Sequence, residues 1–256
     1  MKTMNFMISL LSLIFLGQIL SCSSLKKAKL SENPEFEKNA EKFVITSPLS
    51  HSPSQSNKFI IEDVSADTVF EIETHSERPE SDRNTIEGKT TEEGYKVKSK
   101  EFTSYKFYIA KPFYESHYEV IGKATRFRTE EDKGDRGTES TQLAYPLEFW
   151  IFEEGKDVGK ITVSEPNLNL TGDIAASIHG KHLNLKYQAD MFNKTSVSFE
   201  DEQGLLAFFH SKSSGFISTK QKGEFLIKHD LPEELKLDIL ATYMIVETIM
   251  GINSGR

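Results

Sequence analysis

The stretch "DLPEELKLDILATYMIVETIMG", Asp230 to Gly251, carries the strongest fold signal in the chain. It predicts a helix over residues 231–250. Asp230 suits the N-cap position, and Glu233 stands three residues later, where it completes a capping box. Gly251 follows the last apolar residue as a left-handed stop. We therefore expect a helix near the C-terminus with both of its ends marked by local sequence.

This helix has no single polar face. At about 100° per residue, Asp238 and Glu247 point in opposite directions. A helix that is apolar nearly all round must be surrounded by protein or by lipid. Polar interruptions make it unfit to span a bilayer, and it lacks the Lys- and Arg-rich face of a helix that lies on a membrane. We therefore expect a β-sheet to close around it. The apolar positions that surround its axis are Leu237, Ile239, Leu240, Tyr243, Met244, Ile245, Val246, Ile249 and Met250.

The residues before this helix have the pattern of short antiparallel strands. "SYKFYIAK", 104–111, alternates apolar and polar residues, and its aromatic residues at period two indicate the core face of a sheet rather than a stacking platform for bases or sugars. "YPLEFWIFEEGKDVGKITVSE", 145–165, predicts a hairpin with a glycine-containing turn. The expected fold is mainly β (α+β): an antiparallel β-barrel or sandwich over residues 59–256, with a buried hydrophobic C-terminal helix at 231–250.

Many antiparallel strands followed by one apolar helix resemble the tubby-like fold, which tubby, the LURP-one-related proteins and phospholipid scramblases share. The resemblance covers Tyr95 to Met250. Its most similar pieces are "FWIFEEGKDVGKITVS", 149–164, and "KHDLPEELKLDILATYMIVETIM", 228–250. It implies a closed barrel around a central helix, and binding of lipid or protein at the barrel surface. No basic cluster of the phosphoinositide-binding type stands at a matching position, so the resemblance assigns no binding residue.

The N-terminus has the layout of a secretion signal. Lys2 precedes the uncharged run "FMISLLSLIFL", 6–16, and small residues follow it. That run has the length of a signal-peptide hydrophobic region and is too short for a membrane span. We predict a signal peptide over residues 1–21.

The only cysteine of the chain, Cys22, ends the stretch "ILSC", 19–22, which resembles the bacterial lipobox. The resemblance implies cleavage between Ser21 and Cys22, a diacylglyceryl group on the Cys22 sulfur and acylation of the new amine, with palmitate as a typical acyl group. Two or more acyl chains hold a protein stably at a membrane. The alternative is an ordinary secretion signal with an incidental cysteine beside its cleavage site. A single cysteine excludes an intramolecular disulfide.

Residues 22–58 are expected to form a lipidated N-terminus and a disordered, flexible tether. "TSPLSHSPSQSNK", 46–58, is rich in Ser, Pro, Asn and Gln and has little apolar area to bury. "FEKNAEKFVI", 36–45, is expected to order locally. The folded domain is expected to begin at Phe59.

Composition and motifs exclude several classes of function. The net charge of −8 argues against non-specific binding of nucleic acid. "HSERPESDRNTIEGKTTEEGY", 75–95, lacks the ligand spacing of a calcium loop and predicts a long solvated loop. No G-x-S-x-G elbow and no glycine-rich phosphate loop is present, and "SKSSGF", 211–216, has the pattern of a turn.

One histidine pair is a candidate metal site. His179 and His182 form the H-x-x-H pair "HGKH" beside a predicted turn. On a strand, residues three apart point to opposite faces, and a zinc site would need further ligands. We therefore expect no metal ion, no cofactor and no catalytic residue.

The sequence leads to one functional hypothesis and two alternatives. The expected protein is a non-catalytic lipoprotein of the bacterial envelope, anchored through Cys22 to the outer membrane or cell surface, whose β-rich domain binds a protein or lipid partner and no nucleic acid. The first alternative is a protein that handles phospholipids or acyl chains. The second is a hydrolase with an unrecognised site.

Overall fold

The computed structural model describes residues 29–30, 32–48, 56–63, 68–77, 80–91, 94–110, 117–132, 137–165, 171–189, 195–212 and 220–253. Within these ranges the chain forms antiparallel strands and one long helix, α2 (Glu233–Asn253). No helix among these residues is long and apolar enough to cross a bilayer. The prediction of a mainly β, antiparallel fold with a buried hydrophobic C-terminal helix is confirmed.

Fourteen strands are described, and all belong to one sheet. In the first half of the chain they are β1 (Ala40–Pro48), β2 (Ser56–Glu62), β3 (Thr68–Ser76), β4 (Glu80–Thr91), β5 (Gly94–Ala110), β6 (His117–Asp132) and β7 (Gly137–Leu143). In the second half they are β8 (Leu147–Glu153), β9 (Lys156–Val163), β10 (Thr171–Ile178), β11 (Lys181–Ala189), β12 (Thr195–Asp201), β13 (Gly204–Lys212) and β14 (Lys220–Lys228).

Neighbouring strands pair antiparallel in the order β4-β5-β3-β2-β1-β14-β13-β12-β11-β10-β9-β8-β6-β7, and β5 also pairs with β6. Most neighbours are consecutive in the chain, as expected for strands joined by hairpins. The paired strands that lie farthest apart in the sequence are β1 and β14, where Ala40 lies opposite Lys228. The first and last strands of the body are therefore joined directly.

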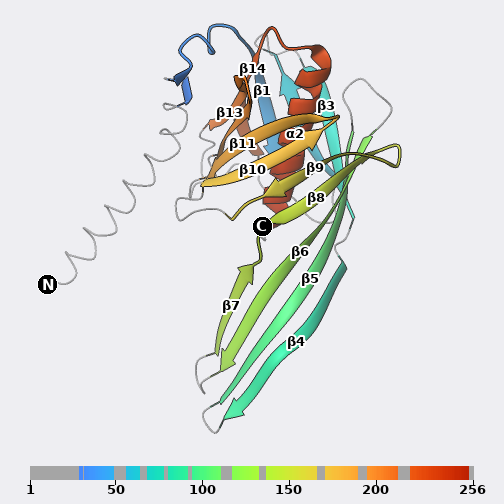
Figure 1. Ribbon diagram of the computed structural model, residues 1–256, viewed down its shortest axis with the longest axis vertical. Helices are drawn as coiled ribbons and strands as arrows, with labels where there is room; N and C mark the ends of the chain where they lie inside the picture. The colour runs from blue at the N-terminus through green and yellow to red at the C-terminus, as the bar shows by residue number, and fades with distance from the viewer. Residues whose placement is uncertain are drawn as a thin grey trace, which may run out of the picture.

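The helix α2 lies inside the curve of the sheet (Figure 1). Its apolar side chains form one core with the inward side chains of the strands. Tyr243 packs against two strand residues, with ring centroids 4.5 Å from Phe209 and 5.2 Å from Phe225. Because the sheet supplies apolar partners on several sides, a helix without a polar face is stable here. Its fully buried members include Ile239, Ala241, Tyr243, Met244, Ile245, Val246 and Ile249.

Four strands extend away from this body as an arm, which we define as β4, β7, and residues 94–104 of β5 and 126–132 of β6 (Figure 1). In the arm β5 lies between β4 and β6, and β6 lies between β5 and β7. Nearer the body β5 changes partner, and Thr74 of β3 pairs with Ile109. β4 and β7 are the last strands of the pairing order, so each has one unpaired edge among the described strands.

The folded part begins earlier than the predicted boundary at Phe59. Residues 40–48 and 56–58, which the sequence placed in the tether, belong to β1 and β2. In addition, Phe36 packs with Leu205, Phe208 and Leu226 in a second apolar cluster. The strand at 40–48 was not predicted from the sequence, because the strand that pairs with it along its whole length is β14, at the other end of the sequence.

Two further boundaries are corrected. Residues 80–91, expected within a solvated loop, form β4 and pair with β5. The segment lacks an alternating apolar pattern, and its strand is defined by its pairing with β5. The helix begins at Glu233 and continues through Gly251 to Asn253, so the predicted glycine stop does not end it.

Candidate functional site

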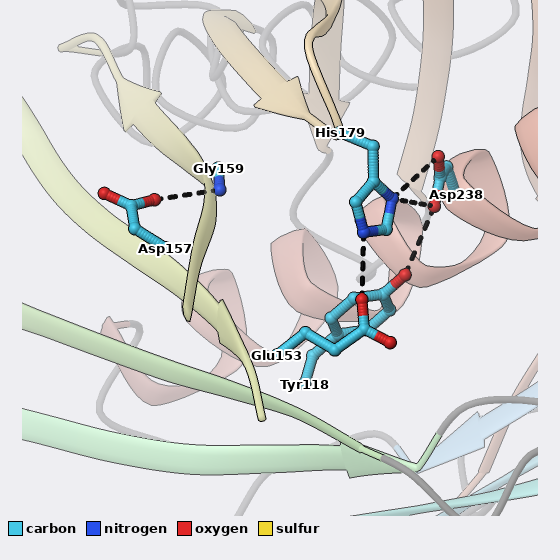
Figure 2. A network of polar contacts seen from close by, with 6 residues as sticks. All are labelled: Tyr118, Glu153, Asp157, Gly159, His179 and Asp238. Carbon is cyan, nitrogen blue, oxygen red and sulfur yellow. Dashed lines mark hydrogen bonds and ion pairs between the residues drawn. The ribbon is translucent and has the colours of Figure 1, made fainter. Parts of the chain in front are cut away.

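Four polar side chains meet where one end of the sheet reaches the first turns of α2 (Figure 2). Tyr118 comes from the start of β6, Glu153 from the end of β8, His179 from the turn between β10 and β11, and Asp238 from α2. The four residues are far apart in sequence, so only the folded chain brings them together.

His179 lies between two carboxylates. Its Nδ1 is 3.1 Å from Oδ1 and 3.3 Å from Oδ2 of Asp238. Its Nε2 is 2.9 Å from Oε2 of Glu153. The hydroxyl of Tyr118 donates to Oδ1 of Asp238 at 3.2 Å. The result is a continuous chain of contacts from β8 through the imidazole to the helix and β6.

Turn geometry places the imidazole. His179 and Gly180 have φ of 47° and 73°, and Glu154 and Gly155 have φ of 50° and 74°. Positive φ at both central residues is the pattern of a two-residue type I′ hairpin turn. A residue other than glycine with positive φ is uncommon, although histidine tolerates it better than most. The His179 amide donates to the Val158 carbonyl at 2.8 Å, which ties its turn to β9.

The inner part of this chain of contacts is buried, and the outer part faces solvent. Tyr118 is 2% exposed and Asp238 is 7% exposed. The side chain of His179 is 36% exposed and that of Glu153 is 21% exposed. A buried carboxylate needs hydrogen-bond donors, and the phenol and the imidazole provide them for Asp238. Removing either donor would leave part of a buried charge without a partner.

The protonation of the imidazole determines how many of these contacts are hydrogen bonds. A carboxylate only accepts, so each ring nitrogen must carry a proton to donate to its neighbour. A neutral imidazole donates to one carboxylate only, whereas an imidazolium donates to both. Neither ring nitrogen is left to accept a proton from a molecule in the open cleft while both contacts are held.

A cleft of about 590 Å³ opens beside these side chains. It lies between the β8–β9 turn, the β10–β11 turn and the start of α2. Carboxylates dominate the charged groups that line it, with one lysine and one histidine. The lining residues are Tyr118, Glu153, Glu154, His179, Lys181, Pro232, Glu234, Leu235, Leu237 and Asp238. The cleft combines an acidic rim with an apolar wall from α2, and we refer to it as the acidic cleft.

A second group of charged residues joins β1 to the start of α2. The ammonium group of Lys236 contacts Oε1 of Glu41 at 2.6 Å and Oε1 of Glu233 at 2.9 Å. His229 contacts Glu41 through Nδ1 at 2.7 Å. Partial burial acts to raise the pKa of Glu41, but the hydrogen bonds from Lys236 and His229 outweigh it and hold that pKa below its usual range. These charges compensate one another and have a structural role in docking the helix.

The sequence-predicted residues fall in different places. Ser21 and Cys22, with the predicted signal peptide and lipidation site, lie outside the described residues. His179 is in the turn, but His182 is in the following strand, so the two do not form a ligand pair. The carboxylates beside His179 contact opposite ring nitrogens and do not converge on one point. Among the described residues, no group of three or more His, Cys, Asp or Glu side chains is placed to hold a metal ion.

Sequence reasoning did not predict Tyr118, Glu153 or Asp238 as site residues. The local sequence marks two of the four site residues as unusual. Asp238 is a charged residue that interrupts the apolar run of the helix, and His179 precedes a glycine where a two-residue hairpin normally has Asn or Asp. Nothing in the local sequence connects these two residues.

The fold and the site together define a β-rich protein that encloses its C-terminal helix and carries an acidic surface cleft. The chain matches no protein-family model, and neither a curated protein nor a solved structure is significantly similar to it.

Proposed function

We propose that this chain is a lipid-anchored, non-catalytic protein of a bacterial cell envelope, and that its β-rich domain binds a basic group of a partner protein in the acidic cleft. The observation that carries the binding function is the charge of the cleft. Glu154 and Glu234 line it, and neither of their side chains makes a hydrogen bond or ion pair with another described residue. Two carboxylates without an ion-pair partner on the wall of a cleft attract a cation.

This charge favours a protein partner over a phospholipid headgroup. A phosphate would be repelled by the carboxylates, whereas a lysine or arginine side chain would place its charge between them and its methylene stem against Leu235 and Leu237. The space inside the sheet is occupied by α2, which disfavours an internal site for an acyl chain. The alternative of a lipid-handling protein therefore receives less support than a surface that binds protein.

A binding role also suits the arrangement around His179. The two carboxylates occupy both ring nitrogens, so the imidazole is held as a structural element of the cleft wall. A general base needs a nitrogen that can reach the proton of a bound substrate. The alternative of an unrecognised hydrolase is therefore less well supported than binding.

The cleft can be tested with a small cationic probe. N-acetyl-arginine amide, added to the full chain at low ionic strength, is expected to shift the NMR signals of His179 and Tyr118. Changing Glu154 and Glu234 together to glutamine should weaken this binding by about twofold to thirtyfold, because each exposed ion pair contributes roughly 0.2–1 kcal/mol. Glu202→Gln, an exposed change at the β12–β13 turn, is the matched control and should leave binding unchanged. Equal shifts in all three proteins would contradict the proposal.

The anchor has a separate test. Cells expressing the natural chain are expected to incorporate radiolabelled palmitate into it, and Cys22→Ala should abolish that incorporation, since Cys22 is the only thiol. The variant should also move from the membrane fraction to the soluble fraction if cleavage still occurs. Palmitate incorporation that survives in the Cys22→Ala protein would rule out lipidation at this residue.

A further inference from the structure

The imidazole of His179 lies on the wall of the acidic cleft, where a change in its charge alters the contacts of two carboxylates. Histidine is the side chain whose charge ordinarily changes between pH 5 and 8. The His179 side chain is 36% exposed, so solvent protons reach it. Its ring lies between Glu153 of β8 and Asp238 of α2 (Figure 2). The charge of the ring therefore decides which of these carboxylates receives a hydrogen bond from it.

The imidazolium donates to both carboxylates, whereas the neutral ring donates to one. The side chain of Asp238 is 10% exposed and that of Glu153 is 21% exposed. The more buried carboxylate loses more when a donor is withdrawn, so the remaining proton of the neutral ring belongs on Nδ1, beside Asp238. Nε2 then turns a lone pair toward Oε2 of Glu153, 2.9 Å away, and this contact is no longer a hydrogen bond. Loss of the ring proton thus removes one donor from Glu153.

The other groups around the ring favour a cation in the cleft when the imidazole is neutral. They are Glu154 of the β8–β9 turn, Asp157 of β9, Lys181 of β11, Glu234 of α2 and Tyr118 of β6. Asp157 points away from the ring and accepts from the amide of Gly159 at 3.0 Å (Figure 2). The carboxylates that line the cleft then outnumber its one ammonium group, that of Lys181. An imidazolium adds a second cation to the wall and repels an incoming lysine or arginine.

We propose that the acidic cleft exchanges a proton for its basic ligand: the cation of the partner replaces the His179 imidazolium beside Glu153, and the cleft releases the partner as the pH falls below neutral. The inference rests on the proposed binding function and adds Glu153 as the carboxylate that receives the basic group. Protonation of His179 opposes binding because the imidazolium both holds Glu153 and repels the ligand. The coupling is reciprocal, so the bound cation must in turn make the ring harder to protonate.

The exchange can be measured in the full chain with N-acetyl-arginine amide at low ionic strength. The guanidinium of this probe stays charged at every pH used. Between pH 5.5 and 8, carboxylates with ordinary pKa values of about 4 also keep their charge. We expect the probe to bind about threefold to tenfold more weakly at pH 5.5 than at pH 8, the effect of one exposed ion pair lost and one like charge gained.

A second readout follows the ring itself. In NMR titrations, saturating probe should lower the pH at which half of His179 is protonated by the logarithm of the same factor, about 0.5–1 pH unit. A ring with a purely structural role would show no such shift.

Three variants assign the effect to its residues. His179→Asn keeps a residue that suits the turn before Gly180 but has no proton to exchange, so its binding should be independent of pH. Glu153→Gln should weaken binding at pH 8 and leave little further loss at pH 5.5. His182→Gln removes an exposed histidine of β11 that does not line the cleft, and this matched control should keep the pH dependence of the natural chain. Circular dichroism of each variant checks that the sheet is intact.

The outcomes separate this inference from the function on which it rests. Binding that is equally tight at pH 5.5 and 8, or a His179→Asn protein that keeps the natural pH dependence, would overturn the exchange and leave the cleft as a cation site. Absence of binding at every pH would contradict the cation site itself, and the exchange would be rejected with it.

Discussion

Replacing Ile245 with aspartate is expected to unfold the domain. Ile245 is fully buried near the middle of α2, within the main apolar core. An unpaired carboxylate at such a position costs several kcal/mol, on the order of 3–5 or more. Typical domains are stable by about 5–15 kcal/mol, so the change removes most or all of the stability. Thermal unfolding followed by circular dichroism should show no cooperative transition.

A volume-conserving change at the same position separates the charge from the packing. Ile245→Leu should cost less than about 1.5 kcal/mol and keep a cooperative transition. If Ile245→Asp melted at the temperature of the natural chain, the helix would not be central to the fold. The main conclusion about the core would then be wrong.

The second large effect is a gain in stability when Glu247 is changed to glutamine. Glu247 is 7% exposed on α2, and its Oε1 has no hydrogen-bond partner among the described atoms. Burial raises the pKa of Glu247 from 4.5 to about 7, although the nearby hydroxyls of Tyr243 and Thr195 favour the charged form. The folded chain therefore holds this proton more tightly than the unfolded chain does.

The sign of the pH dependence follows from this difference. Below about pH 4.5 the carboxyl is neutral in both states and folding carries no penalty. As the pH rises from 4.5 to 7, the unfolded chain loses the proton first, so stability falls. At about 1.4 kcal/mol per pKa unit, the total loss is about 3 kcal/mol, and it is complete above pH 7.

Urea unfolding across this pH range provides the measurement. Glu247→Gln should raise the free energy of unfolding by about 3 kcal/mol at pH 8 and by much less near pH 4.5, because glutamine has no charge to bury. Glu234→Gln, at an exposed position on the same helix, is the control and should keep the pH dependence of the natural chain. A Glu247→Gln protein with the same pH dependence as the natural chain would contradict this account.

The sequence predicted the buried helix and most strands of the body for local reasons. A helix without a polar face requires partners around it, and Asp238 and Glu247 are polar interruptions that do not share one face. The hairpin of β8 and β9 was also predicted, because alternating residues and a glycine turn lie within one short segment. In these cases the information needed was within a few residues.

The errors have a common physical cause. The strand at 40–48 forms through pairing with β14, and β4 forms through pairing with a polar stretch of β5. Neither strand has an apolar pattern strong enough to identify it alone. A β-strand becomes stable through its partners, so its identity depends on residues that can lie far away in the chain.

The site shows the same limit. His179 was noticed in the sequence only as part of a histidine pair, and its actual partners are 26 residues away at Glu153 and 59 residues away at Asp238. The partner of Asp238, Tyr118, is 120 residues away from it. No spacing rule connects such residues.

The sequence alone therefore determined the properties that depend on near neighbours: an uncharged apolar run at residues 6–16, a helix that must be surrounded by apolar partners, and a succession of short strands. The tertiary structure decided where the folded part begins, that four strands form an arm, and which polar groups share a cleft. Helices and turns are stabilised within a few residues, whereas sheet pairing and charge clusters are stabilised by contacts between distant segments, and these exist only after the chain has folded.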